Sequence, residues 1–228
     1  MKELRIYTRG ERSASDYAPE PDPVVDGSIA LGERIGQGKR SQVWQCRFEG
    51  RDAAIKIYRQ AHIEKYRRRY GIDIAQFEYL RNRRFRDTPG LEGYCAEPLA
   101  VFDNSSGVSP AFVQSLVDGP RLIDVATELG YCPPEVLAAG YRIVELAAAV
   151  GLHDLDINAG NIRLHKQDGR WVPELHDFNM VPQHIHAPNP LRALMLRLGI
   201  RDRSIRDYQT LERWKYLGRP LARRADVR

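Results

Sequence analysis

A carboxylate, an amide and a second carboxylate follow one another closely in the second half of the chain. Asp156 precedes Asn161 in the segment DLDINAGNI, and Asp177 follows in HDFNM. Carboxylate and amide oxygens are ligands that Mg²⁺ prefers, and a carboxylate can also orient a hydroxyl and accept its proton. The three residues therefore suit magnesium-assisted phosphoryl transfer, with Asp156 as catalytic base and with Asn161 and Asp177 as metal ligands.

A glycine-containing loop in the first half of the chain could close over phosphate groups. Gly36 and Gly38 lie in IGQGKRSQVW, and Ser41 stands where a third glycine often occurs. Glycine lets backbone N–H groups approach a phosphate closely. The loop is expected between two strands, whereas the dinucleotide-binding fingerprint needs a strand followed by a helix. Taken alone, the motif is better explained as a plain hairpin turn.

Lys56 lies in AAIKIY, an otherwise apolar segment in which a buried ammonium group would need a partner. It follows Gly38 by 18 residues (56 − 38), the length of one hairpin, which would bring it beneath the glycine loop. Glu78 in AQFEYL, on the next expected helix, is the candidate partner. This pairing by itself is only slightly better supported than a chance arrangement.

The order of these signals favours one interpretation. A glycine loop, a strand lysine, a helix glutamate, an Asp-x₄-Asn loop and an Asp-Phe-Asn segment occur in the order and approximate spacing of the protein-kinase signature set. Each signal alone is common, but five of them in the right order are improbable by chance. We therefore interpret the chain as kinase-like.

The elements that must position these residues change in type along the chain. Short β-branched runs separated by glycines predict an antiparallel meander, and apolar residues at helical spacing among arginines predict one helix after it. Two strands, two helices, a hairpin and a helical tail follow, and the tail leucines are expected to face the core. The expected segments are 29–38, 41–50 and 51–59 for the meander, 59–87 for the helix, 93–104 and 109–119 for the strands, 122–129 and 132–151 for the helices, 152–180 for the hairpin and 191–228 for the tail.

Length and composition exclude several classes of protein. The chain has 228 residues, of which 43% are hydrophobic and 29% charged, so a collagenous or wholly disordered chain is ruled out. The best apolar run, ELAAAVGL, is far shorter than the roughly 20 residues of a membrane helix, and the N-terminus lacks a signal-peptide core. Three widely spaced cysteines indicate neither a disulfide framework nor a zinc site. A cytoplasmic protein without an integral membrane segment is expected.

The positive charge is concentrated in the tail. Residues 191–228 hold 11 Lys and Arg against 4 Asp and Glu, which leaves 24 basic and 26 acidic side chains in the other 190 residues. The tail therefore carries a net charge of +7 (11 − 4) and the remainder −2 (24 − 26). Such a surface could contact nucleic acid, anionic lipid or a phosphorylated ligand, and a solvated arginine-rich surface is an equally good explanation.

With these motifs in place, the chain resembles compact bacterial members of the protein-kinase-like superfamily. The closest resemblance is to the YrbL-type PhoP-regulatory-network family, which is allied to the lipopolysaccharide core kinases. It is carried by IGQGKRSQVW, AAIKIY, FEYLRNRR, DLDINAGNI and the basic Leu-Arg-Trp tail, over residues 30–218. The resemblance implies an α+β, bilobed protein-kinase-like fold, with a five-stranded antiparallel N-lobe plus one helix and a shortened, mostly helical C-lobe.

The resemblance also implies domain limits and a division of roles. A flexible leader over 1–28 would precede an N-lobe over 29–115 and a truncated helical C-lobe with a basic tail over 116–228. ATP would lie in the cleft with Mg²⁺, and Lys56 would contact its α- and β-phosphates while pairing with Glu78. The Ser115 carbonyl and the Val117 N–H would bind the adenine edge. The remaining roles fall to Gly36, Gly38, Ser41 and Val43 at the nucleotide, to Asp156 as catalytic base, and to Asn161 and Asp177 as magnesium ligands.

Two motif positions depart from the family pattern. Asp154 stands where a histidine usually precedes the catalytic aspartate by two residues, and Asn179 replaces the glycine of Asp-Phe-Gly. Only 49 residues (228 − 179) follow Asn179, and they include no Ala-Pro-Glu, so the peptide-docking half of the C-lobe is expected to be missing. A small or carbohydrate hydroxyl, including one on an anionic glycolipid, then suits the site better than a large protein acceptor.

Two other functions compete with an active kinase. Asp154 and Asn179 favour a pseudokinase, a nucleotide-binding module whose tail contacts a partner. The arginine-rich surfaces could instead associate with nucleic acid or with an anionic membrane surface, with tyrosines at 66, 70 and 79 available for stacking. Nucleic acid is the weaker prediction, because helix packing explains the same tyrosines.

Overall fold

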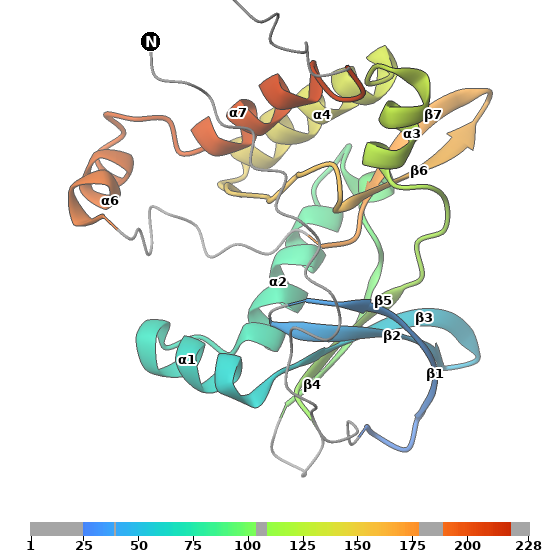
Figure 1. Cartoon of the computed structure of the whole chain (residues 1–228). Helices are drawn as coiled ribbons and strands as arrows, with labels where there is room; N and C mark the ends of the chain where they lie inside the picture. Colours follow the sequence, from blue (N-terminus) through green and yellow to red (C-terminus); the bar gives the residue numbers. More distant parts are fainter. Residues whose placement is uncertain (1–24, 39, 104–108, 178–188, 220–228) are drawn as a thin grey trace, which may run out of the picture.

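The computed structural model describes residues 25–38, 40–103, 109–177 and 189–219, which form two lobes (Figure 1). The N-lobe contains a five-stranded antiparallel sheet with the strand order β1-β2-β3-β5-β4. The five-stranded N-lobe predicted from the sequence is therefore correct. The strands are β1 (Ile29–Gln37), β2 (Ser41–Phe48), β3 (Arg51–Tyr58), β4 (Pro98–Phe102) and β5 (Ala111–Ser115). The predicted leader lies almost entirely outside the described residues.

Two helices, and not the one expected, follow the meander. They are α1 (Gln60–Tyr70) and α2 (Ile74–Arg86). Gly71 ends α1 in the left-handed conformation, with φ at 64°. The Asp73 carboxylate then caps α2 by accepting hydrogen bonds from the backbone N–H groups of Ala75 and Gln76. The Gly-Ile-Asp break thus gives α2 its own start and its own direction.

The sheet is apolar on both faces at its centre. Ala53, Ile55 and Ile57 on β3 belong to a core cluster with residues of β1, β2 and β5. Tyr58 and Phe112 belong to a second cluster that includes residues of α1 and α2. Helix α2 also packs against β4 and β5. Lys56 on β3 therefore faces α2 in surroundings from which water is largely excluded.

The C-lobe is mainly helical and has a single hairpin in its described part. After a 3₁₀ turn at Glu92–Tyr94 and the strands β4 and β5, the chain enters this lobe at α3 (Figure 1). The large C-lobe core cluster draws on α3, α4, β6, β7 and α7. The elements are α3 (Leu122–Leu129), α4 (Pro134–Ala149), β6 (Ile162–Gln167), β7 (Arg170–Leu175), α6 (Pro190–Arg197) and α7 (Ile205–Trp214).

Helix α7 crosses α4 at very short range. A Cβ atom added to Gly140 on α4 would lie 2.7 Å from a Leu211 side-chain atom and 2.8 Å from one of Trp214. Both of those residues are buried, Leu211 at 0% exposure and Trp214 at 2%. Part of the basic tail therefore belongs to the core, because α7 closes the C-lobe beneath the loop that carries Asp156.

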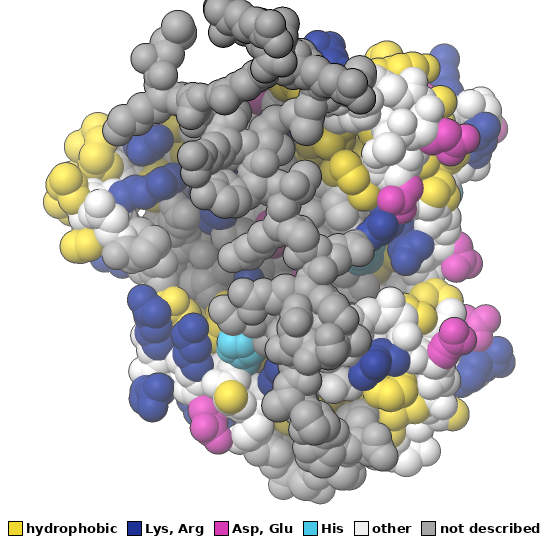
Figure 2. Space-filling view, in the orientation of Figure 1, with side chains coloured by type: hydrophobic (Ala, Val, Ile, Leu, Met, Phe, Trp, Pro, Cys, Tyr) yellow, Lys and Arg dark blue, Asp and Glu magenta, His cyan; other side chains and the backbone are white. Residues whose placement is uncertain are grey.

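Helix α6 differs from expectation. Its leucines were expected to face the core, but only Ala193 and Leu196 are buried, while Leu194 is 51% and Leu198 is 63% exposed. The helix projects to the side of the C-lobe, and Figure 2 shows apolar and basic side chains together on that projection. Among the described residues, none of the helices has the length and apolar character to cross a membrane.

The three cysteines are buried as free thiols. Cys46 lies on β2, Cys95 follows the 3₁₀ turn and Cys132 precedes α4. Burial raises the pKa of the Cys46 and Cys132 thiols to about 11 and that of Cys95 to about 12. At neutral pH all three are therefore protonated and behave as small apolar core residues.

Candidate active site

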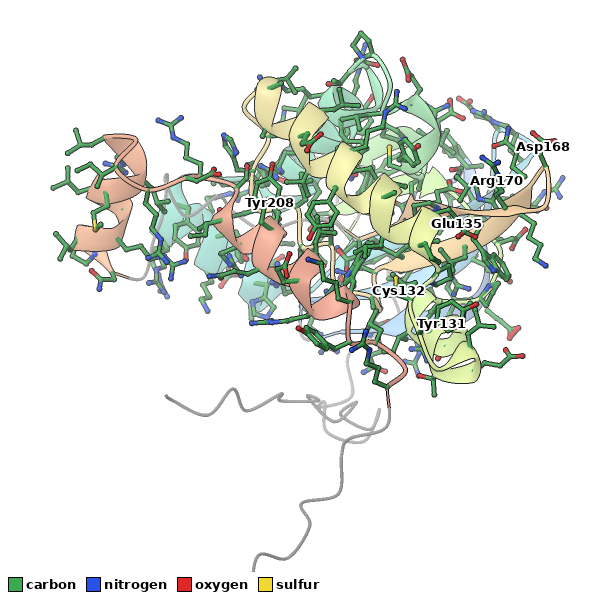
Figure 3. All side chains as sticks on the ribbon, turned by 90° about the horizontal axis from the view of Figure 1, so that it is seen from above. Tyr131, Cys132, Glu135, Asp168, Arg170 and Tyr208 are labelled. Atoms are coloured by element: carbon green, nitrogen blue, oxygen red, sulfur yellow. The ribbon has the colours of Figure 1, made fainter. Side chains whose placement is uncertain are left out.

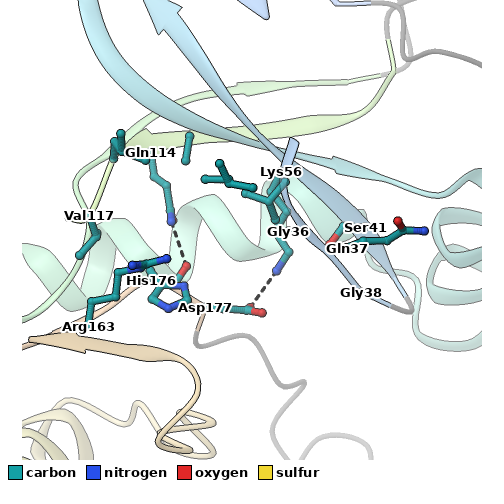
Figure 4. Close-up of a pocket in the computed structure, with 14 residues that line it drawn as sticks. Gly36, Gln37, Gly38, Ser41, Lys56, Gln114, Val117, Arg163, His176 and Asp177 are labelled. Atoms are coloured by element: carbon teal, nitrogen blue, oxygen red, sulfur yellow. Dashed lines mark hydrogen bonds and ion pairs between the residues drawn. The ribbon is translucent and has the colours of Figure 1, made fainter. Parts of the chain in front are cut away.

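A cavity of about 250 Å³ lies between the lobes (Figure 4). Most of the residues predicted to bind a nucleotide line it, namely Gly36, Gly38, Ser41, Val43, Lys56 and Val117, and so does Asp177. Ser115 does not line it, and its hydroxyl accepts a hydrogen bond from the backbone N–H of Glu97. The cavity is also lined by residues that were not predicted from the sequence, which include Ala54, Gln114, Arg163 and His176.

Lys56 connects three segments that are distant in sequence. Its Nζ lies 2.9 Å from Oε2 of Glu78 on α2 and 2.8 Å from Oδ1 of Asp177 after β7. The Tyr58 hydroxyl, two residues further along β3, donates a hydrogen bond to Glu78. The Glu78 side chain is fully buried, at 0% exposure, so its charge is balanced entirely by these neighbours.

The charges of this cluster depend on one another. Burial would lower the pKa of Lys56, but the Asp177 and Glu78 carboxylates raise it above its ordinary value. Burial would raise the pKa of Asp177, but the Lys56 ammonium holds it below its ordinary value. Burial also raises the pKa of Glu78, against the opposing influence of Lys56. Asp177 is thus an ionised carboxylate in the lining of the cavity.

Asp156 and Asn161 lie in one loop between α4 and β6. The Asn161 amide Nδ2 donates to the carbonyl oxygen of Asp156 at 2.9 Å, and Asn158 Nδ2 donates to the Asp156 carboxylate at 3.3 Å. The backbone N–H of His176 donates to the carbonyl of Asn161, which sets Asp177 beside this loop. Burial and the nearby Asp177 charge raise the pKa of Asp156, which brings it closer to the range of a useful general base.

Helix α7 fixes the backbone of this loop. The Asp207 carboxylate accepts the backbone N–H groups of Asp154 and Leu155, both at 2.8 Å. The Trp214 indole N–H donates to the carbonyl of Ile157 at 3.1 Å. Asp154 and Asp156 both have positive φ, 56° and 57°, a conformation that aspartate tolerates better than most residues. The α7 contacts hold the loop in this strained path.

The N-lobe helix α2 also contacts the loop. Arg81, one turn after Glu78, is buried and donates from Nη2 to the carbonyl of His153 at 2.8 Å. Asp154, which stands where the family pattern has histidine, is 2% exposed and pairs with Arg206 Nη1 at 3.1 Å. The aspartate at this position therefore forms an ion pair with a residue of α7. Asn179, the second departure, lies outside the described residues.

Two residues that line the cavity donate hydrogen bonds to backbone carbonyl groups. Gln114 at the end of β5 donates from Nε2 to the carbonyl of His176 at 2.9 Å, and Arg163 on β6 donates from Nη1 to the carbonyl of Gly119 at 2.6 Å. Gly119 has a φ of 104°, and a Cβ there would lie 2.2 Å from the carbonyl oxygen of Leu164. The segment that joins the lobes therefore crosses β6 at a distance that only glycine permits.

The chemistry of the donor set suits magnesium. Asp177 is ionised, and the Asn161 amide uses its nitrogen in the hydrogen bond to Asp156, which leaves its oxygen available as a hard ligand. No group of three or more His, Cys, Asp and Glu side chains that could hold a metal exists among the described residues. An ion here would therefore need additional oxygens, as Mg²⁺ bound together with a nucleotide obtains from phosphates and water.

Comparison with known proteins identifies the fold. No family model matches the sequence, and no curated protein matches it. The kinase domain of PknI from Mycobacterium tuberculosis, solved as a double mutant, has a TM-score of 0.59 and 19% identity, and the match covers 91% of this chain and 80% of that one. The chain therefore has the fold of a protein-kinase domain.

Two further kinase structures are similar over smaller shares of their length. Rad53 1–466, in complex with AMP-PNP, has a TM-score of 0.56 and 16% identity over 84% of this chain and 48% of that one. The kinase domain of PF14_0431 has a TM-score of 0.50 and 14% identity over 71% and 53% of the two chains. The chain thus spans about half the length of these two structures.

Proposed function

We propose that this protein is an ATP- and Mg²⁺-dependent phosphotransferase that moves the γ-phosphoryl group of ATP to a hydroxyl. The observation that carries the proposal is the contact of Lys56 with both Glu78 and Asp177 at an interlobe cavity that Lys56 and Asp177 line. A buried lysine held between two carboxylates, and facing a glycine loop, can bind phosphate oxygens as a fixed cation.

Each remaining group has a role in this proposal. The backbone N–H groups around Gly36 and Gly38 would surround the phosphates, and Asp156 would orient the acceptor hydroxyl and take its proton. Asn161 and Asp177 would hold Mg²⁺, which when bound neutralises phosphate charge. The raised pKa of Asp156 supports its role as base, since a base works best when its pKa approaches the working pH.

The acceptor we propose is a small or carbohydrate hydroxyl, with a protein hydroxyl as the broader alternative. An anionic glycolipid is supported by the arginines and exposed leucines on and around α6, which would suit a surface that is both negatively charged and apolar. Membership of the YrbL-type family, a cytoplasmic location and the limits of the leader and the lobes all stay predictions.

A pseudokinase is the second candidate, and Asp154 favours it. Its carboxylate is committed to Arg206, so the histidine of the family pattern has no counterpart at this position. In that case the protein would bind ATP and regulate a partner without transferring phosphate, and substitution of Asp156 would leave its cellular function intact.

Binding and transfer can be separated by two variants. We expect ATP with Mg²⁺ to raise the melting temperature of the wild type, and Asp177→Ala to abolish the magnesium-dependent part of that rise. Asp156→Asn should keep the rise but lose ATP turnover and transfer to a hydroxyl acceptor. Asp168→Asn, in the β6–β7 turn (Figure 3) and not among the residues that line the cavity, is the matched control. Absence of any nucleotide effect in the wild type would refute the proposal, and binding without turnover would favour the pseudokinase.

A further inference from the structure

Helix α6 presents a row of apolar side chains to solvent. Leu191, Leu194 and Leu198 are each more than half exposed, and Ile200, which follows the helix, is 67% exposed. Positions i, i+3 and i+7 lie on one side of a helix, so the three leucines form a single leucine row. An exposed apolar row of this kind is typical of a surface that contacts another molecule.

The helix is held in shape at both ends. The side-chain oxygen of Asn189 accepts hydrogen bonds from two backbone N–H groups of the first turn, at 2.9 and 3.4 Å. At the other end, the Arg203 guanidinium donates to the carbonyls of Leu196 and Arg197, at 3.0 and 3.2 Å. Leu196 is also buried, on the side of the helix opposite the leucine row. The leucine row is therefore displayed by a helix that is formed before any contact is made.

The charged side chains of this projection are all arginines. Residues 190–201 include Arg192, Arg197 and Arg201 and contain no acidic residue. Because successive residues of a helix are rotated by about 100°, Arg192 and Arg197 lie on either side of the leucine row. Such a helix suits the interface of an anionic membrane, in which apolar side chains enter the acyl region while the guanidinium groups stay at the lipid phosphates.

A second basic helix lies on the same side of the molecule. The last turn of α1 in the N-lobe holds Arg67, Arg68 and Arg69, all of them exposed. Figure 1 shows α1 and α6 on one side of the two lobes, and Figure 2 shows Lys and Arg side chains gathered over α1 on that side. An extended anionic surface can contact both helices at once, and each basic side chain near such a surface adds to the attraction.

We propose that α6 attaches this protein to an anionic lipid membrane, with the leucine row inserted into the membrane and the arginines of α6 and α1 at the lipid phosphates. The inference goes beyond the proposed function, because it concerns attachment and not phosphoryl transfer. It bears on the acceptor through Ser204, which comes seven residues after the end of α6 (204 − 197). The Ser204 hydroxyl lies 2.8 Å from Nδ1 of His153, in the loop that carries Asp156. Attachment at α6 would therefore hold lipid against the lobe that carries the proposed base.

The test is co-sedimentation of the full chain with vesicles, without nucleotide or Mg²⁺. The vesicles contain phosphatidylcholine alone or phosphatidylcholine mixed with anionic phosphatidylglycerol, and we expect the wild type to bind the mixed vesicles. Leu194→Ser combined with Leu198→Ser should lower this binding more than about tenfold and leave the melting temperature unchanged, since both leucines are exposed. Leu129→Ser on α3, 41% exposed on the other side of the C-lobe (Figure 1), is the control and should bind like the wild type.

The contribution of charge is tested on α1, away from the leucine row. Arg68→Gln combined with Arg69→Gln should lower binding to the anionic vesicles about tenfold at low salt, and the difference from the wild type should shrink as salt is added. Arg170→Gln, at the exposed start of β7 (Figure 3), removes an arginine from a different part of the surface and should leave binding unchanged.

Several results would overturn the inference. They are a wild type that does not bind anionic vesicles, and full vesicle binding by the leucine variant. Equal affinity of the wild type for duplex DNA and for anionic vesicles, unchanged in the leucine variant, would assign the surface to charge alone. A dimer in solution that the leucine variant dissociates would assign the leucine row to a second copy of the chain. Each of these results would leave the phosphotransferase proposal standing, and a wild type that binds no ATP would leave the membrane inference standing.

Discussion

The two lobes hold their proposed catalytic groups in different ways. In the N-lobe, Lys56 is positioned by other side chains, the Glu78 carboxylate and the Asp177 carboxylate. In the C-lobe, the loop around Asp156 is positioned through its backbone, which Asp207 and Trp214 of α7 contact directly. An ion pair depends on the protonation state of both partners, whereas a backbone contact is indifferent to the side chain beside it.

This difference explains why the C-lobe tolerates unusual residues. Because Asp207 binds the N–H groups of Asp154 and Leu155, these two hydrogen bonds require no particular side chain at either position, although the positive φ of Asp154 suits a residue such as aspartate. Asp154 can therefore replace a histidine and still leave Asp156 in place, provided that a partner such as Arg206 neutralises it. In the N-lobe, neither Lys56 nor Glu78 can be replaced as easily, because each buried charge is neutralised by the other.

Removal of the α7 carboxylate should give the largest effect. Asp207→Ala leaves two buried N–H groups without acceptors, and we expect a loss of about 4 kcal/mol in the free energy of unfolding. Urea denaturation at pH 7 measures it. Gln209→Ala on the exposed side of the same helix is the control and should leave the midpoint nearly unchanged. Similar losses in both variants would mean that the loop is not anchored specifically by Asp207.

The second largest effect is expected from pH, through the titration of the Asp207 carboxyl group. Burial, the largest influence, raises the pKa of Asp207 from an ordinary 3.8 to about 7. The folded state therefore holds this proton more tightly than the unfolded chain, and the resulting stability is full below pH 3.8 and is lost as the pH rises through 7. Relative to Asp207→Asn, the wild type should lose about 2–3 kcal/mol between pH 5 and pH 8.

Paired urea titrations of the wild type and Asp207→Asn at the two pH values isolate this contribution, because all other titrating groups are shared. Parallel pH profiles would show that the hydrogen bonds from Asp154 and Leu155 keep the carboxylate ionised throughout. The contact of Asp207 with the Asp156 loop would then be independent of pH, and the two lobes would differ more clearly in how they hold their proposed catalytic groups.

Disruption of the Lys56–Glu78 ion pair in the N-lobe should have a smaller effect on stability, and this effect should also depend on pH. Lys56→Met leaves the Glu78 carboxylate buried with Tyr58 as its remaining polar neighbour, and we expect a loss of about 2 kcal/mol at pH 8. Burial already raises the pKa of Glu78, and removal of Lys56 would raise it further. The loss should therefore shrink as the pH falls and Glu78 becomes protonated.

The double variant Lys56→Met with Glu78→Gln provides the check on this explanation. It removes the buried charge entirely, so its stability at pH 8 should exceed that of Lys56→Met, although neither variant should transfer phosphate. A double variant that is less stable than Lys56→Met would show that the lobe depends on the packing of Glu78 and not on its charge.

The smallest effect is expected for Tyr58→Phe. This substitution removes one hydrogen bond to Glu78 while the ring stays in its core cluster, and it should cost about 1 kcal/mol. In combination with Lys56→Met the cost should be clearly different from 1 kcal/mol, because both residues share one partner. Simple additivity, measured by a double-mutant cycle, would show that the hydroxyl and the ammonium act independently on Glu78.

The sequence allowed the fold and the order of the proposed catalytic residues to be predicted, because both follow from local patterns. Gly36 and Lys56 lie in recognisable strands and Asp177 follows one, while Glu78 lies on a helix whose apolar residues recur at roughly helical spacing. The single expected helix over 59–87 was wrong, because the break depends on Gly71 and on the cap supplied by Asp73.

The supporting residues escaped prediction for a physical reason. Arg81 lies in an arginine-rich stretch that is typical of a solvated helix face, and only the fold brings it to His153, 72 residues away. Asp207 looks like an ordinary acidic residue in the first turn of a helix. Arg163 could have been noticed from its place two residues after Asn161, but it lines a cavity that both lobes build.

The buried cysteines make this protein a convenient object for labelling. Because Cys46, Cys95 and Cys132 are enclosed and protonated at neutral pH, thiol reagents should modify them only when the surrounding lobe opens. One cysteine introduced on the surface would then be the fast-reacting site against a slow background. Since Cys46 belongs to the sheet and Cys132 to the helical lobe, their separate rates would report which lobe opens first.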